Sequence, residues 1–438
     1  MKKGFLLIIT LLFTTAAFSQ NVISLFNRAN QFFDFLQAEK FADAHACFED
    51  STKNKITQEN LKQLWTDIST KLGKAESLDA IQSKTQGEYF AVTVEGKFAN
   101  GDQNFLLGFN KAEKIVGLFL APKARGNAYL SPAYADTTLY TEKQLYINTP
   151  GHQLAAILTV PKNTKNFPIV VFVHGSGPSD MDESIGPNKP FKDISAGLAA
   201  QGIASLRYVK RTLVYPNEFG KSFTVKEEVV DDAVAALNLA KTVPNADLKN
   251  IYLFGHSLGG MLAPKIAGLV PNLNGIILAA APARKLTDMI AEQSKYLMGK
   301  TSDTSALIKK QNQMILGEIE KSRFTQLGAM KPDSLVLGLP ASYWVDLNAY
   351  DQVAAAQKLI KTRILVVQGG NDYQVSKQDY DFWNSNLSTK GNAEFKFYPA
   401  LNHLFSVQME KGTSEQYLYP SSVSATFIND LVAWIKIQ

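Results

Sequence analysis

The chain has 438 residues, of which 45% are hydrophobic and 19% charged, and its formal net charge is +5 at pH 7. This length predicts more than one domain, and a charge this close to balance gives no indication of nucleic-acid binding or of attraction to a membrane surface. Cys47 is the only cysteine, which excludes an intramolecular disulfide. We expect it to be a small buried side chain.

The first 19 residues have the layout of a secretory signal peptide. Lys2 and Lys3 precede an apolar run over residues 5–13, and small residues follow up to Ser19. The run is too short to span a bilayer. We therefore exclude residues 1–19 from the fold and expect a secreted or periplasmic protein without stable membrane insertion. Removing the two lysines lowers the net charge to about +3, which does not favour nucleic acid as a partner.

Residues 20–120 are expected to form a small α+β unit. Apolar residues recur every three or four positions over residues 26–72, which predicts helices. From residue 75 to 120 the pattern alternates between turn sequences, which predicts antiparallel strands. This order resembles the cone-shaped fold of the nuclear transport factor 2 superfamily. The unit contains His45 but no cluster of polar residues, so we expect a packing, substrate-shaping or dimerising role, and an oligomer formed through this unit is left open.

Residues 121–137 contain two prolines and several small residues and are predicted to be a linker. Residues 138–438 then alternate short apolar runs with helix-like stretches, which predicts a doubly wound, mostly parallel α/β sheet of the α/β-hydrolase class. The expected strands are residues 139–147, 154–160, 169–173, 203–208, 251–254, 276–279, 364–367 and 394–397, and the expected helices are residues 191–201, 226–240, 260–269 and 377–387.

Residues 251–260 read Ile-Tyr-Leu-Phe-Gly-His-Ser-Leu-Gly-Gly, which places a serine between two glycines directly after a predicted strand. This pattern is typical of a nucleophile elbow, in which the serine occupies a strained strand-to-helix corner. Side chains two residues before and after the serine would collide there, and Gly255 and Gly259 occupy those positions. Because sites in such sheets lie at the carboxyl ends of the strands, Ser257 is the candidate nucleophile.

A serine hydroxyl needs a base and a group that orients this base, and in this fold they follow in the order serine, acid, histidine. His403 is the only histidine after Ser257 and lies in a loop that follows a predicted strand. Asp372 directly follows the preceding predicted strand and is the candidate acid. Asp379 is the alternative, but we expect it to face solvent from the next helix, and Asp346, which precedes the strand, is less suitable.

The oxyanion that forms during acyl transfer needs N–H donors. One donor is expected from Leu258, at the amino end of the helix after the nucleophile. The second is expected from the His-Gly-Ser-Gly-Pro loop after the strand at residues 169–173, where Ser176 is the first choice and Gly175 the alternative. His174 in this loop and His256 beside the nucleophile are interpreted as structural residues.

These motifs carry a family resemblance. Residues 138–438 resemble the bacterial α/β-hydrolase carboxylesterases of the esterase D type, close to the dienelactone hydrolase and serine aminopeptidase-like families. The resemblance implies that Ser257, Asp372 and His403 are the catalytic triad and that esters with short acyl groups are hydrolysed. The sequence departs from the family at Val209, where an acidic residue is usual. The matching motifs are residues 173–178, 185–191, 202–204, 255–264 and 342–344.

Two cations, Lys210 and Arg211, follow a predicted strand near the expected site. They are candidates for binding an acidic group of the substrate. We favour instead a structural role, in which they form ion pairs with Asp180, Asp182 and Glu183 on the neighbouring loop.

About eighty residues separate the strand that ends near Ala281 from the strand that begins at Ile364, far more than a crossover requires. We interpret residues 283–348 as an inserted cap of helices that shapes an apolar acyl pocket. Tyr343 and Trp344 are the candidate residues for lining this pocket.

The sequence therefore predicts a secreted serine esterase that cleaves a small-molecule ester through an acyl-enzyme. No metal or organic cofactor is implied, because no histidine, cysteine or carboxylate cluster has ligand spacing. Three alternatives stay open. The same triad would serve a peptidase or aminopeptidase, or an acyltransferase, and a protein of another class would bind a ligand through the small unit while its hydrolase domain is silent.

Overall fold

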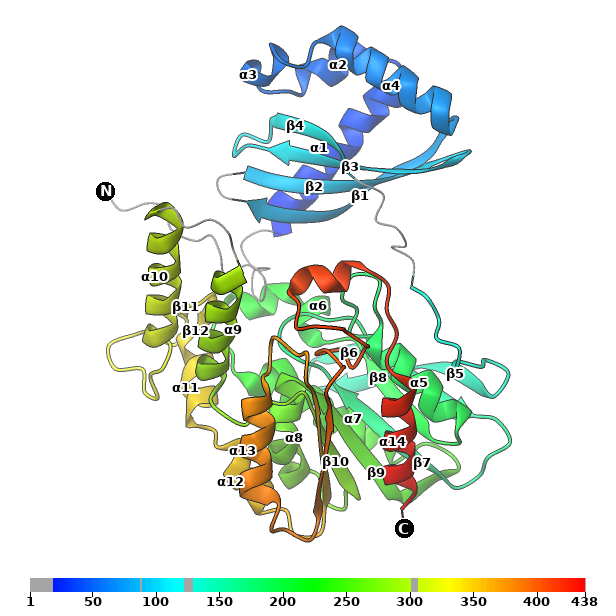
Figure 1. The fold of residues 1–438 in the computed structure, drawn as a ribbon, viewed down its shortest axis with the longest axis vertical. Helices are drawn as coiled ribbons and strands as arrows, with labels where there is room; N and C mark the ends of the chain where they lie inside the picture. The colour runs from blue at the N-terminus through cyan, green and yellow to red at the C-terminus, as the bar shows by residue number, and fades with distance from the viewer. Residues whose placement is uncertain (1–18, 87–88, 122–128, 301–305, 438) are drawn as a thin grey trace. The chain divides into compact units, whose positions relative to one another are not determined.

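The computed structural model of the chain describes residues 19–86, 89–121, 129–300 and 306–437. The chain divides into two units, residues 1–126 and 127–438, each with its own sheet (Figure 1). The expected signal peptide lies outside the described residues except for Ser19, which begins the first helix. Within the described ranges, no helix is both long enough and apolar enough to cross a membrane.

The smaller unit packs helices against a four-stranded antiparallel sheet of order β1-β2-β3-β4. Helices followed by antiparallel strands were the sequence prediction, and the structure confirms it. The helices are α1 (Ser19–Gln37), α2 (Phe41–Ala46), α3 (Asp50–Lys53) and α4 (Gln58–Leu72), and the strands are β1 (Ala75–Gln86), β2 (Tyr89–Phe98), β3 (Gly101–Phe109) and β4 (Ile115–Ala121).

Aromatic residues of the predicted helical stripe form the core of this unit. Phe32 contacts Phe33 and Phe48 edge to face, with ring centroids 5.2 and 5.6 Å apart. Helix α4 begins with a capping box in which Thr57 and Asn60 each accept the other's backbone N–H. Periodic burial and a defined helix start therefore account for this half of the chain.

The larger unit contains an eight-stranded sheet of order β14-β13-β10-β9-β7-β8-β6-β5. Only β6 runs antiparallel to its neighbours, which are β5 and β8. This strand order is that of the α/β-hydrolase fold and confirms the predicted fold class. The strands are β5 (Tyr140–Thr149), β6 (His152–Pro161), β7 (Phe167–Val173), β8 (Ala204–Tyr208), β9 (Ala246–His256), β10 (Gly275–Ala279), β13 (Arg363–Gly369) and β14 (Ala393–Tyr398).

Helices cover both faces of this sheet (Figure 1). Val170 and Phe172 of β7 lie in one core with α5 and α14, whereas Val171 between them points to the other face, against which α7 and α8 pack. Burial on both faces explains why these strands are continuous apolar runs. The helical segments are α5 (Pro190–Ala200), α6 (Arg211–Val214), η1 (Pro216–Gly220), η2 (Lys226–Val230), α7 (Asp231–Ala240), α8 (Leu258–Leu269), α12 (Gln352–Gln357), α13 (Lys377–Leu387), η3 (Ser414–Leu418) and α14 (Ala425–Lys436).

The segment interpreted as a cap is helical, as expected. It lies between β10 and α12 and ends one residue beyond the predicted boundary. It contains α9 (Leu286–Lys300), α10 (Ala306–Lys321), the short hairpin of β11 (Leu335–Val336) and β12 (Leu339–Pro340), and α11 (Ala341–Ala349).

Residues 129–137, at the end of the segment expected to be a linker, contact the larger unit. The Tyr129 hydroxyl donates a hydrogen bond to the Asp193 carboxylate, and the Tyr134 hydroxyl donates one to the carbonyl of Val423, each at 2.7 Å. These contacts make residues 129–137 part of the larger unit.

Candidate active site

Ser257 occupies the corner between β9 and α8 in a strained backbone conformation, with φ 52° and ψ −118°. Such a conformation costs a residue other than glycine about 1–3 kcal/mol and is held only by its surroundings. Here the Ser257 N–H donates to the carbonyl of Ala279, and the Ser257 carbonyl accepts from Met261, each at 2.9 Å. The serine is therefore set at the carboxyl end of a central strand, as a nucleophile elbow requires.

The two glycines that flank this serine have no room for a side chain. A Cβ atom on Gly255 would lie 2.4 Å from the carbonyl oxygen of Gly259, and one on Gly259 would lie 2.3 Å from the carbonyl oxygen of Val173. Both distances are far below van der Waals contact with rigid backbone. The expectation that glycine is needed at both positions is confirmed.

Asp372 and His403 lie at the same edge of the sheet and contact each other. His403 Nδ1 is 2.7 Å from Asp372 Oδ2, and both side chains are buried. The other carboxylate oxygen accepts the N–H groups of Gln374 and Val375, and Oδ2 also accepts from the Gln368 amide. Because every partner is a donor, the carboxylate holds the His403 proton on Nδ1 and leaves Nε2 free to accept one.

The loops that carry these groups converge on Ser257. The ring of its neighbour His256 lies 4.6 Å from the ring of His403, and His256 Nε2 is 2.9 Å from the His403 carbonyl. A Cβ atom on Gly175 would lie 3.2 Å from the Ser257 Cβ. Within the described ranges the Ser257 hydroxyl and His403 form no hydrogen bond. Such bonds are often long in the free enzyme and shorten when substrate binds.

Two of the three expected oxyanion donors have a free N–H. Leu258 is the first residue of α8, so its N–H has no partner within the helix. The Ser176 N–H has no hydrogen-bond partner among the described residues. In contrast, the Gly175 N–H donates to Glu183 at 2.6 Å. The alternative choice of Gly175 was therefore wrong, because a buried carboxylate already occupies its donor.

His256 is more than a packing residue, because Glu183 pairs with it. His256 Nδ1 lies 2.9 Å from Glu183 Oε2, and both side chains are buried. Burial alone would lower the pKa of His256, but the Glu183 carboxylate raises it above the usual value. In the same way, burial acts to raise the pKa of Glu183, but His256 and the Gly175 N–H hold it below the usual value. The site thus contains a buried carboxylate–histidine pair that no sequence pattern indicated.

His174 has the structural role that the sequence suggested. Its Nε2 atom donates to the carbonyl of Asp180 over 2.9 Å. Complete burial lowers the pKa of His174 to about 4, so the ring is neutral at neutral pH. It shapes the loop that carries Ser176.

Lys210 and Arg211 form buried ion pairs, as favoured, but with other partners than expected. Lys210 Nζ lies 2.9 Å from Glu228 Oε1 and 2.8 Å from the carbonyl of Gly175, and Arg211 pairs with Asp232. Both partners belong to the segment formed by η2 and α7. Because the ammonium and guanidinium groups are buried and paired, neither is available to an acidic substrate.

The carboxylates on the loop at residues 180–183 are used elsewhere. Asp182 accepts from Arg207 at 2.8 Å and from Lys189 at 3.0 Å, and Asp180 accepts backbone N–H groups of its own loop. The predicted pairs were wrong because Lys210 is paired with Glu228 and Arg211 with Asp232.

Tyr343 and Trp344 do not line a pocket. Both side chains are fully buried, with 0% of their surface exposed. The Tyr343 hydroxyl donates to Glu228 at 2.7 Å, and the Trp344 indole donates to the carbonyl of Val336 at 2.8 Å. The two residues fix the base of the cap, and the expectation that they face the acyl group was wrong.

A different apolar cluster lies beside the acid and the base. Tyr373 and Leu404, which follow Asp372 and His403 in the chain, pack with Tyr417. Helix α9 of the cap adds two partly buried side chains to this cluster, Tyr296 and Leu297. The rings of Tyr296 and Tyr373 are stacked with centroids 6.2 Å apart. The cap therefore reaches the immediate surroundings of the Asp372–His403 pair.

The rival acid, Asp379, has a structural role that differs from the expected one. It lies on α13 as predicted, but it is fully buried and does not face solvent. Its carboxylate accepts the N–H groups of Ala283 and Arg284 and forms an ion pair with the Arg284 guanidinium at 2.6 Å. Asp346 pairs with Lys265 at 3.6 Å. Neither carboxylate contacts His403.

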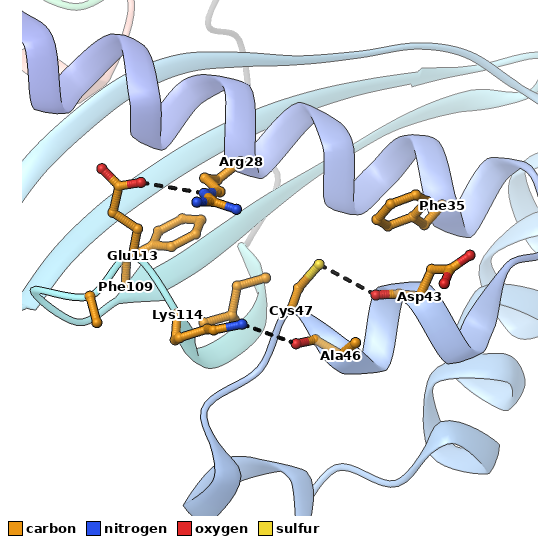
Figure 2. Close-up of a pocket in the computed structure, with 10 residues that line it drawn as sticks. Arg28, Phe35, Asp43, Ala46, Cys47, Phe109, Glu113 and Lys114 are labelled. Atoms are coloured by element: carbon orange, nitrogen blue, oxygen red, sulfur yellow. Dashed lines mark hydrogen bonds and ion pairs between the residues drawn. The ribbon is translucent and has the colours of Figure 1, made fainter.

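The smaller unit has a pocket of about 270 Å³ between α1, α2 and the turn from β3 to β4. Figure 2 shows Arg28 paired with Glu113 at one side and Cys47 beside Asp43 at the other. Cys47 is half-buried here, not fully buried as expected, and burial raises the pKa of its thiol, which makes it a weak nucleophile. No histidine lines the pocket. Its chemistry does not duplicate that around Ser257.

Across the described ranges, no group of three or more histidine, cysteine or carboxylate side chains could hold a metal ion. The groups gathered around Ser257 are a base, an acid and free N–H donors. This set can activate a hydroxyl and stabilise an oxyanion without further components.

The chain is similar in sequence to known proteins. Residues 217–410 match the family model of serine aminopeptidase, S33, and residues 29–118 match a family of unknown function, DUF3887. Esterase EstD of Thermotoga maritima is 34% identical over 407 residues, which cover 92% of this chain and 93% of that protein. The solved structure of Est1E from Butyrivibrio proteoclasticus is 16% identical, with a TM-score of 0.43 over 67% of this chain and 98% of that one.

Proposed function

The chain is a carboxylesterase of the α/β-hydrolase family to which serine aminopeptidase S33 and Esterase EstD belong, and we propose that it cleaves esters through an acyl-enzyme formed on Ser257. The observation that carries this proposal is the convergence of three elements at one sheet edge. These are the strained elbow at Ser257, the Asp372–His403 pair at 2.7 Å, and the loop of Gly175 in contact with the serine.

In the first half-reaction the Ser257 hydroxyl attacks the carbonyl carbon of the ester. His403 Nε2 accepts the hydroxyl proton, and Asp372 stabilises the resulting imidazolium through its bond to Nδ1. The tetrahedral intermediate collapses when the C–O bond to the alcohol breaks. His403 gives its proton to the leaving oxygen, and the acyl group remains on Ser257.

In the second half-reaction a water molecule replaces the alcohol. His403 accepts a proton from this water as it attacks the acyl carbon, and then returns the proton to the Ser257 oxygen. The carboxylic acid leaves and the free serine is restored. His403 thus acts as a base and then as an acid in each half-reaction. Asp372 must therefore hold His403 in one tautomer throughout.

Each tetrahedral intermediate carries an oxyanion, for which we propose the N–H groups of Leu258 and Ser176 as donors. Both are free of competing acceptors among the described residues. The amino end of α8 adds a favourable dipole to the Leu258 donor. Loss of one such donor from an oxyanion hole costs about 10²–10³-fold in kcat in related chemistry.

Replacement of the nucleophile tests the proposal. Ser257→Ala should reduce the hydrolysis of p-nitrophenyl butyrate by at least about 10³-fold, since only oxyanion stabilisation and binding remain. Ser385→Ala, which removes an exposed hydroxyl on α13, is the matched control and should retain the activity of the parent protein. Full activity of Ser257→Ala would exclude this serine as the nucleophile.

The name of the matching family model favours a peptidase as the second candidate. An aminopeptidase needs a free carboxylate for the substrate ammonium. Glu183 and Glu228, which contact the loop beside Ser257, are both buried; Glu228 is paired with Lys210, and Glu183 lies 2.9 Å from His256 Nδ1. This pairing supports ester cleavage over aminopeptidase activity. Parallel assays of aminoacyl amides and butyryl esters separate the two, and interception of the acyl group by an added alcohol or amine would reveal an acyltransferase.

For the acyl group we propose short chains. The support is the apolar cluster beside Asp372 and His403, whose bulky side chains limit the room for an acyl chain. Its members are Tyr373, Leu404 and Tyr417, with Tyr296 and Leu297 added from α9. A series of p-nitrophenyl esters from acetyl to decanoyl tests it. The highest kcat/KM should fall at butyryl or below.

We also propose that the protein works outside the cytoplasm. The support is the sequence of residues 1–19, with Lys2 and Lys3 before an apolar run and small residues up to Ser19. Amino-terminal sequencing of the protein from the periplasm or medium should begin at Gln20. An uncleaved protein in the cytoplasm would contradict this proposal.

A further inference from the structure

Charged side chains hold the backbone on both sides of the Ser176 N–H. Lys210 Nζ donates to the Gly175 carbonyl at 2.8 Å, and the Gly175 N–H donates to Glu183 at 2.6 Å. On the other side of Ser176, the Gly177 N–H donates to Glu228 at 2.8 Å. Both amides that flank Ser176 are thus tied to carboxylates, and the Ser176 N–H between them is free.

Lys210 is fixed in place by several contacts. Its ammonium lies 2.9 Å from Glu228 Oε1, and the second oxygen of Glu228 accepts from the Tyr343 hydroxyl at 2.7 Å. Its backbone N–H donates to the carbonyl of Ser179 at 3.0 Å, so the same residue contacts both ends of the loop. Lys210 and Glu228 are each only 2% exposed. Burial acts to raise the pKa of Glu228, but Lys210 and the other donors lower it below the usual value.

Stability alone is a poor explanation for this cluster. Removing two charges from water costs several kcal/mol per ion, and an apolar pair of similar size is often as stable or more stable. Lys210 also directs a hydrogen bond at one backbone carbonyl, a contact that its ion pair with Glu228 does not need. This extra bond indicates a role in the loop rather than in the core.

The geometry of the peptide indicates what that role is. In a trans peptide the C=O and the following N–H point in opposite directions. Lys210 therefore binds the Gly175 oxygen from the side opposite to the one on which the Ser176 N–H is presented. A cation on the carbonyl oxygen draws electron density from the amide nitrogen, and hydrogen bonds in such chains strengthen one another.

We propose that Lys210 is a positioning residue that polarises and orients the Gly175–Ser176 peptide, so that the Ser176 N–H becomes a stronger donor to the oxyanion, and that Glu228 holds Lys210 for this task. The inference rests on the proposed function, because it needs an acyl-transfer oxyanion beside Ser257. It assigns to Lys210 a role in the reaction that does not involve contact with the substrate.

The role predicts a characteristic kinetic effect. An interaction that strengthens as the oxyanion forms lowers kcat when it is lost and leaves KM nearly unchanged. For Lys210→Met, with p-nitrophenyl butyrate as substrate, we expect kcat to fall about 10- to 100-fold, less than the loss of a whole donor. KM should stay within about twofold, and the affinity for an alkyl boronic acid, which forms a tetrahedral adduct on serine, should fall by a factor similar to that in kcat.

Two further variants separate positioning from a merely structural ion pair. Lys210→Arg keeps a cationic donor and should recover most of the lost kcat. The double variant Lys210→Met/Glu228→Gln leaves no uncompensated buried charge, so it should regain thermal stability relative to Lys210→Met. We expect its kcat to remain as low as that of Lys210→Met. Lys226→Met, which removes a lysine from an exposed ion pair on η2, is the matched control and should behave as the parent protein.

Three results would overturn the inference. They are a kcat of folded Lys210→Met within twofold of the parent value, a loss expressed in KM alone, and full recovery of kcat in the double variant. If Lys210→Met does not fold, the double variant provides the decisive comparison. If the proposed function is wrong, Ser257→Ala stays active. If Ser257→Ala is inactive and Lys210→Met has the kcat of the parent protein, only the inference about Lys210 is refuted.

Discussion

Asp372→Asn is the substitution whose effect follows most directly from the geometry. Oδ1 of Asp372 accepts two backbone N–H groups, those of Gln374 and Val375, which cannot turn away. The remaining oxygen of an asparagine must therefore stay on that side, and its NH₂ group replaces Oδ2. This NH₂ faces His403 Nδ1, which can then contact it only as an acceptor.

The consequence is the wrong tautomer of the base. With Nδ1 unprotonated, the proton of His403 moves to Nε2, the atom that must accept the Ser257 proton. In a serine protease of another fold the same change lowers kcat by about 10⁴-fold, which corresponds to about 5.5 kcal/mol of transition-state stabilisation. We expect a loss of about 10³–10⁴-fold here, with KM for p-nitrophenyl butyrate changed less than threefold, because Asp372 is buried behind His403.

The control is Asp379→Asn, which alters the other buried carboxylate that follows β13. It should lower the melting temperature, because Arg284 and two backbone N–H groups lose a charged acceptor. Its kcat at 25 °C should remain within about threefold of the parent value. Initial rates at 410 nm on protein of verified melting temperature measure both variants. More than a tenth of the parent kcat in Asp372→Asn, or equal losses in the two variants, would refute the assignment of the acid.

Three further expectations concern the pocket, the elbow and the pH dependence. Leu297→Ala should shift the preferred p-nitrophenyl ester by two or more carbons toward longer acyl chains. An unchanged chain-length profile would show that α9 does not contact the acyl group. Gly259→Ala places a Cβ atom 2.3 Å from the Val173 carbonyl and should lower stability by about 3 kcal/mol or more in urea unfolding, and a loss under 1 kcal/mol would contradict this contact. The raised pKa of His256 contributes stability that is complete below about pH 6.5 and is lost as the pH rises through the folded-state value. Glu183→Gln should therefore reduce the free energy of unfolding more at pH 6 than at pH 9, and an equal reduction at both would count against the ion pair.

Short sequence patterns predicted the serine elbow and the positions of the acid and the base, because each depends on residues that are adjacent in the sequence or follow a strand. The elbow is short and constrained by backbone collisions at Gly255 and Gly259, so its signature is contiguous in the sequence. Asp372 and His403 each follow a strand, and the order of the strands brings their loops to one edge. The alternation of apolar runs predicted this sheet because parallel strands are buried on both faces.

Pairings between distant charges could not be predicted in the same way. Glu228 contacts a loop 51 residues earlier in the chain, and no periodicity links its helix to that loop. Lys210 was expected to pair with Asp180, Asp182 or Glu183 because their loop was predicted to neighbour it, although Glu228 is nearer in the sequence. Asp379 was expected to face solvent from the helix after Asp372, and only the fold shows that Arg284 and two N–H groups surround it. Aromatic residues such as Tyr343 and Trp344 often line pockets. Here the packing of the cap buries both side chains completely, and the sequence does not show that packing.

Ser257 is proposed to carry the acyl group, and the measurement that tests this is intact-protein and peptide mass spectrometry after acid quench of a reaction with p-nitrophenyl butyrate. We expect a butyryl adduct of about 70 Da during turnover. It should lie on the peptide that contains Ser257 and be absent from Ser257→Ala. An adduct on another residue, or rapid ester hydrolysis by Ser257→Ala, would contradict it.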